Sequence, residues 1–201
     1  MAVKRALTVN EIRNYQPVEL EFEGIWKDAI GKPELTGSWI IWGNSGNGKT
    51  RFALQLAKYL TNFRRVAYDS LEEGLSKTMK TAIIDTGIGK NFLFLDKEPI
   101  AKLRERLAKR KSPDVIFIDS LQYSGMTYND YKRLRDDFRN KLFILVSHAE
   151  GSEPKGNVAK SIRYDANVKI PVVGYATEPI SRYGGGERFI IWQYGYDKFN
   201  I

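Results

Sequence analysis

The sequence contains no cysteine among its 201 residues. This absence excludes disulfide bonds, cysteine-ligated zinc sites and thiol catalysis, and it is compatible with a cytoplasmic protein. The sequence also lacks any apolar run close to the roughly 18–20 residues that cross a bilayer, so no membrane partner is expected. The first residues, 1–5, have no apolar core of the signal-peptide kind, and we expect no export signal.

The chain has a surplus of basic residues. It carries 32 Lys and Arg against 24 Asp and Glu, a formal net charge of +8. A surplus of this size is compatible with a nucleic-acid partner, although a soluble protein that is merely basic shows the same composition. The length suits one domain with a real core, and no linker separates residues 1–37 from the rest. We therefore predict a single domain over residues 1–201, with residues 1–37 as an N-terminal lead-in segment.

The strongest motif is a glycine-rich loop between an apolar run and a helical pattern. Residues 39–42 predict a strand, and residues 51–60 predict a helix. The loop between them fits the phosphate-binding pattern G-x-x-x-x-G-K-[ST] at every fixed position. Its residues are Gly43, Asn44, Ser45, Gly46, Asn47, Gly48, Lys49 and Thr50. Strand, loop and helix thus follow one another in the order that a phosphate-binding P-loop requires.

The residue types of this loop suit a nucleotide triphosphate. The glycines let the backbone curl so that its N–H groups point at an anion, and the following helix adds the positive end of its dipole. Lys49 can reach the β- and γ-phosphates, and the Thr50 hydroxyl is a hard oxygen ligand for Mg²⁺. We predict that the loop binds the nucleotide together with Arg51, the first residue of the helix.

Further apolar runs predict a mostly parallel central sheet flanked by helices, which is an α/β fold. Residues 115–118 are apolar without alternation, as in a strand that is buried on both faces. Asp119 follows at the end of that strand where α/β proteins bind ligands, so it is the expected acidic partner of Mg²⁺, with capping of the next turn as the alternative. The other predicted strands are 66–70, 91–95 and 142–146, and the other predicted helices are 75–86, 98–111 and 128–140.

The last third of the chain has a different composition. Residues 149–163 are polar and contain glycine, and we predict a mobile loop there. Late strands are expected over residues 166–173, 174–180 and 188–194. Residues 181–187, which include three successive glycines, are expected to join the last two of these strands as a hairpin.

The order of these motifs resembles the RecA-like P-loop ATPases, which include the recombinases and the DnaB-type replicative helicases. The resemblance covers most of residues 24–194, and the short length resembles the compact members of phages and mobile elements. It implies a RecA-like α/β fold with late antiparallel strands, ATP and Mg²⁺ as ligands, and a homo-oligomer with ATP at the subunit interfaces. No guanine-reading Asn/Thr-Lys-x-Asp motif is present, so ATP is the default nucleotide.

The resemblance also implies roles for individual residues. Residues 69–73 are similar to the segment that carries the catalytic glutamate of this family, and we favour Glu72 as the base, with Glu73 as the neighbouring alternative. His148 stands where the family usually has an amide side chain that senses the γ-phosphate, so it either donates a hydrogen bond there or simply packs. Arg182 resembles the cation that reaches a neighbour's ATP in DnaB-type helicases. Arg188, or an arginine that is merely exposed, is the alternative.

The two loops that follow the strands ending at Asp119 and His148 are where this family contacts DNA. Tyr123 could stack on a base, and Lys155, Lys160 and Arg163 could contact phosphates. These loops could equally be solvated surface.

The sequence therefore predicts a Mg²⁺-dependent, DNA-stimulated ATPase that acts on single-stranded DNA in recombination, annealing or replication. Two rivals are a DnaB-like translocating motor and a nucleotide-dependent assembly or regulatory protein with little turnover. A small-molecule kinase is a weaker third, because no arginine-rich lid segment is evident.

Overall fold

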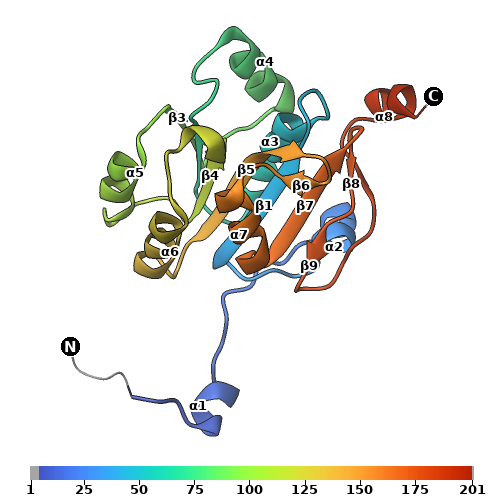
Figure 1. Ribbon diagram of the computed structural model, residues 1–201. Coiled ribbons are helices and arrows are strands. Elements are labelled where there is room, and N and C mark those ends of the chain that lie inside the picture. The colour runs from blue at the N-terminus through green and yellow to red at the C-terminus, as the bar shows by residue number, and fades with distance from the viewer. Residues whose placement is uncertain (1–4, 201) are drawn as a thin grey trace.

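A central sheet with helices on both faces organises the protein (Figure 1). The structure, a computed structural model, describes residues 5–200. Residues 1–4, which make up most of the segment in which we expect no export signal, and residue 201 lie outside the described residues. The strand order is β10-β8-β7-β1-β5-β4-β2-β3. The strands from β7 to β3 pair in parallel, and the late strands β8, β9 and β10 pair antiparallel. No helix in residues 5–200 is long and apolar enough to cross a membrane.

The strands are β1 (Gly37–Gly43), β2 (Val66–Ser70), β3 (Phe92–Asp96), β4 (Val115–Asp119), β5 (Leu142–Glu150), β6 (Glu153–Pro154), β7 (Val168–Val173), β8 (Ala176–Thr177), β9 (Ile180–Ser181) and β10 (Phe189–Ile190). The helices are α1 (Val9–Arg13), α2 (Gly24–Ile30), α3 (Lys49–Leu60), α4 (Lys77–Thr86), α5 (Ile100–Leu107), the 3-10 turn η1 (Leu121–Tyr123), α6 (Tyr128–Asp137), α7 (Asn157–Asp165) and α8 (Gln193–Phe199).

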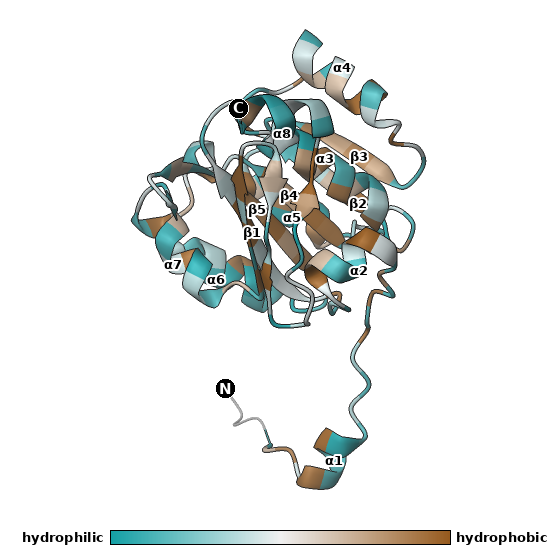
Figure 2. Ribbon diagram, turned by 90° about the vertical axis from the view of Figure 1, so that its right-hand side faces the viewer, coloured by the Kyte–Doolittle hydropathy of each residue, from teal (hydrophilic) through white to brown (hydrophobic). Residues whose placement is uncertain are grey.

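Alternate residues of the central strands bury themselves in two cores, one on each face of the sheet. Trp39 and Ile41 of β1 belong to the core that α2, α3 and α4 cover. Ile40 and Trp42 belong to the core beneath α5, α6 and α7. Figure 2 shows this arrangement as hydrophobic strands between helices whose outer faces are hydrophilic. The predicted α/β fold, with a mostly parallel sheet and late antiparallel strands, is confirmed.

The prediction of a mobile loop over residues 149–163 is wrong. β5 continues to Glu150 and forms a short hairpin with β6, and α7 follows. Within α7, Ala159 and Ile162 are fully buried against the core that also holds Trp42. These apolar positions lie three residues apart on one helix face, and their burial stabilises a helix in a segment that is polar overall.

The late strands also differ from the prediction. β8, β9 and β10 have two residues each, and the chain turns into α8 at Gln193 instead of remaining extended to residue 194. The two stretches that the expected hairpin joins do pair antiparallel, as β8 with β10, but their connection is longer than a simple turn, because β9 lies within it and pairs with β7. The triple-glycine turn instead packs on the lead-in segment, where an added Cβ on Gly185 would lie 2.7 Å from the backbone of Ile30.

The lead-in segment has an anchored part and a projecting part. Leu20 and Phe22 are buried, and Glu19 forms a single antiparallel bridge with Glu34. Residues 5–17, including α1, extend away from the body beyond that anchor (Figures 1 and 2). Residues 18–23 form a short extended stretch with one bridge, because they have no neighbouring strand along their length.

Candidate active site

Four neighbouring strands bring the predicted site residues to one edge of the sheet. The order β1-β5-β4-β2 places the P-loop, His148, Asp119 and Glu72 side by side at the carboxyl ends of these strands. The register pairs Gly43 with His148, and Ser70 with Asp119. A cleft of about 640 Å³ opens at this edge, which is the ligand-binding edge of parallel sheets. Among the predicted residues and their alternatives, this cleft is lined by Asn44, Ser45, Gly46, Gly48, Lys49, Thr50, Arg51, Glu72, Glu73, Asp119, His148 and Lys155.

The P-loop keeps its form because two of its glycines admit no side chain. An added Cβ on Gly43 would lie 2.3 Å from the carbonyl oxygen of Val172 in β7. Gly48 has φ +96°, and a Cβ there would lie 2.8 Å from the ring of Tyr175. Only glycine adopts this conformation readily and permits such close approaches. The Lys49 ammonium donates to the carbonyl oxygen of Asn44 at 3.0 Å, so it lies across the loop.

A turn between β7 and β8 braces the P-loop from the side. The Gly174 N–H donates to the Asn47 side-chain oxygen at 2.8 Å, and the Tyr175 N–H donates to the Asn47 carbonyl oxygen at 3.1 Å. Tyr175 packs edge-on against Trp192, whose ring lies 4.8 Å from the Arg51 guanidinium carbon. Asn47, which we predicted to bind the nucleotide with the rest of the loop, links the P-loop to the C-terminal part of the chain.

Asp119 is buried at the floor of the cleft. It is 8% exposed, and the Tyr68 hydroxyl of the adjacent strand donates a hydrogen bond to its carboxylate. Burial raises the pKa of Asp119 to about 6, against the opposing effects of the Tyr68 hydrogen bond and the Lys49 charge. Burial in turn lowers the pKa of Lys49, while Asp119 and Glu72 act in the opposite direction. Lys49 and Asp119 therefore lie in the same cleft, and burial disfavours the charged form of each.

Glu72 follows β2 and is held in place from β4. The Leu71 and Glu72 N–H groups donate to the carbonyl oxygen of Asp119 at 2.6 and 3.2 Å. One Glu72 carboxylate oxygen accepts from the Ser120 hydroxyl at 2.8 Å and lies 2.8 Å from Nε2 of His148. Burial raises the pKa of Glu72, but the hydrogen bonds from His148 and Ser120 outweigh it, so the pKa lies below its ordinary value.

Glu73 has a different environment. It is exposed, and its carboxylate accepts hydrogen bonds from the hydroxyls of Ser76 and Thr78 at the start of α4. Those contacts fit a structural role at a helix end, whereas Glu72 lies against Ser120 and His148. This geometry favours Glu72 over Glu73 as the candidate base.

Gln122 connects the cleft to the adjacent loops and was missed by sequence reasoning. Its side-chain oxygen accepts from the His148 N–H at 3.1 Å, and its amide donates to the Ser147 hydroxyl at 2.8 Å and to the Lys155 carbonyl at 3.0 Å. The Lys155 N–H also donates to the His148 carbonyl at 2.8 Å. A polar residue three positions after the end of β4 is a signal for such a link, but nothing in the sequence identifies its partners.

The residues predicted to contact DNA fall into two groups. Tyr123 is 57% exposed, and its ring lies 6.3 Å from that of His148, while Lys155 lies on the rim of the cleft. Lys160 pairs with Glu150 at 3.2 Å. Arg163 pairs with Glu153 at 2.8 Å and lies over the Trp42 ring at 5.5 Å. Tyr123 and Lys155 are therefore available at the mouth of the cleft, whereas the charges of Lys160 and Arg163 already have partners.

Arg182 lies far from the P-loop of its own chain. It follows β9, which pairs with Val168 at the start of β7, and Val168 pairs with Trp39 near the start of β1. Gly43 lies four residues further along β1, at roughly 3.3 Å per residue. Arg182 is exposed there, so it could act only on a site of another subunit. The alternative, Arg188, pairs with Glu178.

The donor chemistry of the cleft fits Mg²⁺. Thr50 offers a hydroxyl and Asp119 a carboxylate, both hard oxygen donors on the same cleft. Within residues 5–200, no group of three or more His, Cys, Asp or Glu could hold a metal. Mg²⁺ is usually held by one or two protein oxygens together with phosphates and water.

The fold and the loop define a P-loop protein with the RecA-like α/β fold. Solved structures that share this fold include the following three. The flagellar accessory protein FlaH from Methanocaldococcus jannaschii is 21% identical, with a TM-score of 0.52 over 78% of this chain and 80% of FlaH. A second solved structure, described as an ATPase domain, is 17% identical, with a TM-score of 0.55 over 75% of this chain and 78% of that domain. The ATP synthase subunit NeqB from Nanoarcheaum equitans is 15% identical, with a TM-score of 0.57 over 77% of this chain and 50% of NeqB.

These identities establish a shared fold and nothing more specific. The predicted resemblance to the RecA-like group is confirmed at that level. No protein-family model matches the chain, and no curated protein sequence matches it.

Proposed function

We propose that this protein is an ATPase that binds ATP and Mg²⁺ at the P-loop and hydrolyses ATP with water activated by Glu72. The meeting of Lys49, Thr50, Asp119 and Glu72 at one cleft carries the proposal. The P-loop N–H groups and Lys49 would bind the β- and γ-phosphates, and Thr50 and Asp119 would hold the ion. When bound, Mg²⁺ neutralises charge that develops on the phosphates.

In this proposal Glu72 takes a proton from the attacking water. A general base must lie within hydrogen-bond reach of that water, and its carboxylate must be ionised. The contacts from Ser120 and His148 favour the ionised form, which supports this role. Both contacts are to one oxygen of the carboxylate, so the second oxygen would accept from the attacking water.

We further propose that the protein acts on single-stranded DNA in recombination, annealing or replication, as a cytoplasmic homo-oligomer with ATP at its subunit interfaces. Tyr123 and Lys155 at the cleft mouth support a DNA-contacting surface, and Gln122 would connect it to His148. Arg182, which lies too far to act on its own chain, would complete the ATP site of a neighbour. A DnaB-like translocating motor is a variant of this proposal that would add unwinding activity.

A nucleotide-dependent assembly or regulatory protein with little turnover is the second candidate. The observation that favours it is that His148 and Ser120 both engage the same oxygen of Glu72. These contacts fix the orientation of the carboxylate, and hydrolysis would be slow if a partner had to turn its second oxygen toward the attacking water.

The test is ATP hydrolysis with and without single-stranded DNA, for the wild type, Lys49→Ala and Glu72→Gln. The ATPase proposal expects both variants to lose hydrolysis, with Glu72→Gln still binding ATP, and the DNA proposal expects DNA to raise the wild-type rate. ATP binding without DNA stimulation would refute the DNA assignment and favour the regulatory protein. An active Glu72→Gln beside an inactive Lys49→Ala would place the base elsewhere, with Glu73 next.

A further inference from the structure

The basic surplus of the chain gathers at the amino-terminal edge of the parallel strands, opposite the edge that holds the P-loop cleft. Four helix-to-strand connections meet there and are together called the basic edge: residues 61–65, 87–91, 108–114 and 138–141. They contain eight basic residues and one acidic residue, a net charge of +7, whereas the whole chain carries +8. The four strand-to-helix connections at the opposite edge have a net charge of −2, over residues 44–48, 71–76, 97–99 and 120–127. The surplus is therefore concentrated at one end of the sheet.

Hydrogen bonds join the four connections into one continuous surface. The Asn91 side-chain amide donates to the Thr61 carbonyl oxygen at 3.3 Å, and the Arg65 guanidinium donates to the Lys111 carbonyl oxygen at 2.8 Å. The Lys141 ammonium donates to a hydroxyl and a carbonyl oxygen of the same connection as Lys111, at 2.9 and 2.7 Å. The strand order β5-β4-β2-β3 sets the connections side by side, so three spacings make the edge roughly 14 Å wide.

Most cations of the basic edge are exposed and have no acidic partner. Within residues 5–200, six of them are exposed and form no ion pair: Arg64, Arg65, Lys90, Lys109, Arg110 and Lys111. The cations inside helix α5 differ, because Lys102, Arg104 and Arg106 all pair with carboxylates. Unpaired charges of one sign at such short separations create a positive potential that attracts polyanions.

The chemistry of the basic edge fits a phosphate backbone better than it fits bases or a lipid surface. Its two aromatic residues are Phe63 and Phe138, and both pack on the cores of the sheet. Single-stranded bases stack on exposed rings, and membrane-surface segments insert apolar side chains, but the basic edge offers neither. Duplex DNA carries one charge per ~1.7 Å of its axis, so an edge of this width faces about eight phosphates.

We propose that the basic edge binds the phosphate backbone of double-stranded DNA without reading its sequence. This surface is separate from the proposed single-strand surface, because Tyr123 and Lys155 lie at the mouth of the cleft at the other edge of the sheet. Binding there needs neither nucleotide nor turnover. The inference goes beyond the proposed function and would stand if the ATPase activity were refuted.

The first test is the salt dependence of duplex binding by the full-length wild type. Binding to a duplex of about 20 base pairs is followed by fluorescence anisotropy, without nucleotide, between about 50 and 200 mM salt. Six phosphate contacts predict a slope of about −5 for the logarithm of affinity against the logarithm of salt concentration, a loss on the order of 10³-fold over this range. A slope shallower than about −2, or no duplex binding at about 50 mM salt, would overturn the inference.

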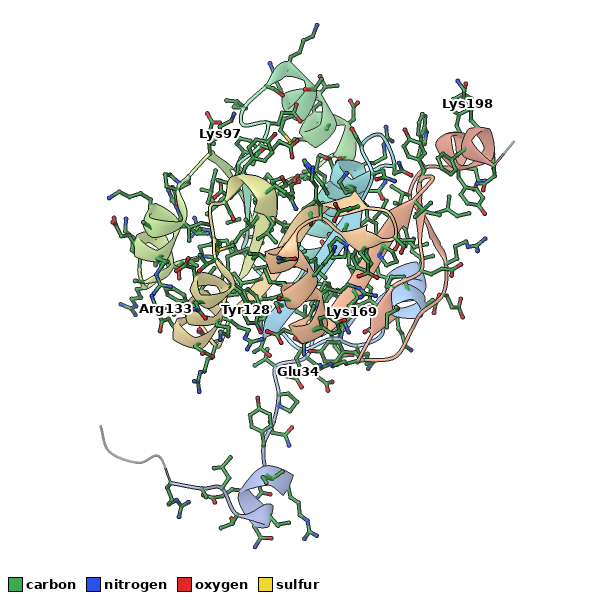
Figure 3. All side chains as sticks on the ribbon, in the orientation of Figure 1. Glu34, Lys97, Tyr128, Arg133, Lys169 and Lys198 are labelled. Atoms are coloured by element: carbon green, nitrogen blue, oxygen red, sulfur yellow. The ribbon has the colours of Figure 1, made fainter. Side chains whose placement is uncertain are left out.

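The second test compares two charge reversals of equal size. Lys109→Glu/Lys111→Glu changes the basic edge, and Lys97→Glu/Lys198→Glu is the matched control, since all four side chains are exposed. Figure 3 shows Lys97 and Lys198 at the end of the body away from Glu34, which precedes β1 at the amino-terminal edge.

The basic-edge variant should bind duplex roughly tenfold or more weakly, with a slope shallower by about 2, while the control binds as the wild type does. Lys109→Gln/Lys111→Gln, which adds no acidic group, should give a smaller loss of the same kind. Equal losses in the basic-edge variant and the control would overturn the inference, because net charge alone would then act.

A third measurement separates this surface from other ligands and from the proposed function. Tyr123→Ala at the cleft mouth should leave duplex binding unchanged, and loss of duplex binding in this variant would overturn the inference. Loss of the proposed single-strand binding alone would leave the inference intact. Binding of the wild type to phosphatidylserine vesicles without binding to duplex would assign the basic edge to a membrane surface and overturn the inference as well.

Discussion

Asp69 should make the protein less stable as the pH rises from 4 to 8. Its side chain is fully buried on the sheet face opposite the P-loop helix, and one carboxylate oxygen accepts from the Glu98 N–H at 3.0 Å. The other oxygen is buried without a hydrogen-bond partner among the described residues. The nearby Arg106 pairs with Glu98 instead. Burial, the largest cause, raises the pKa of Asp69 to about 7.

The magnitude follows from the difference between the two pKa values. The ordinary value is 3.8, and a difference of about 3 units corresponds to roughly 4 kcal/mol. Below pH 4 the carboxyl is protonated in both the folded and the unfolded chain, and it costs nothing. Between pH 4 and 7 the unfolded chain releases its proton while the folded chain keeps it, so the free energy of unfolding falls. Above pH 7 the folded protein carries a buried charge, and the full cost is present.

The assay compares urea unfolding of the wild type and Asp69→Asn at pH 5 and pH 8. Asparagine keeps the shape and the acceptor oxygen but does not ionise. Relative to the variant, the wild type should lose about 3 kcal/mol between these two pH values. The exposed Asp28→Asn is the control and should run parallel to the wild type. Parallel curves for the wild type and Asp69→Asn would refute the reasoning, because Asp69 would then not hold its proton in the folded state.

Three more substitutions test the candidate site. Gly48→Ala should weaken nucleotide binding at least tenfold in titration calorimetry, because alanine is strained at φ +96° and its Cβ meets Tyr175. A variant that binds normally would show that the loop relaxes. Tyr68→Phe should raise the pKa of Asp119 further, since the lost hydrogen bond lowers it, and thus increase the Mg²⁺ needed for half-maximal nucleotide binding, most clearly below pH 7. An unchanged Mg²⁺ requirement would argue against Asp119 as the acidic partner. Arg163→Ala should lower the free energy of unfolding by about 1 kcal/mol in urea titrations without changing DNA binding, because its charge and stacking serve the fold. Loss of DNA binding with unchanged stability would restore Arg163 to the DNA surface.

The parallel core of the fold was predictable because its signals are local. Buried parallel strands appear as unbroken apolar runs, such as residues 115–118, and the P-loop is one contiguous motif. Helix α7 was not predictable in this way. Its few apolar residues become a helix face only because α6 and β1 provide the surface that buries them. The pairing of β10 with β8 was expected as a hairpin, but the pairing of β9 with β7 was not, since a two-residue strand has almost no signal of its own.

The candidate site shows the same division. The roles of Lys49 and Thr50 follow from their places in one motif, and Asp119 follows from the end of one strand. The sequence signal for Tyr68 is weaker. Its hydroxyl lies in an otherwise apolar strand, and a buried hydroxyl needs a hydrogen-bond partner. That this partner is Asp119 depends on which strands lie side by side. The hydrogen bonds of Gln122 join it to Ser147 and His148, which are distant in the sequence, so only the three-dimensional structure identifies them.

The chain has a single histidine, and it lies 2.8 Å from the carboxylate of Glu72. A proton NMR spectrum of the unlabelled protein will therefore contain one set of imidazole resonances, which come from His148 in the P-loop cleft. Those resonances can be followed through additions of nucleotide, magnesium or DNA, without a mutation, a dye or an isotope. His148 is thus an intrinsic NMR probe of the proposed active site.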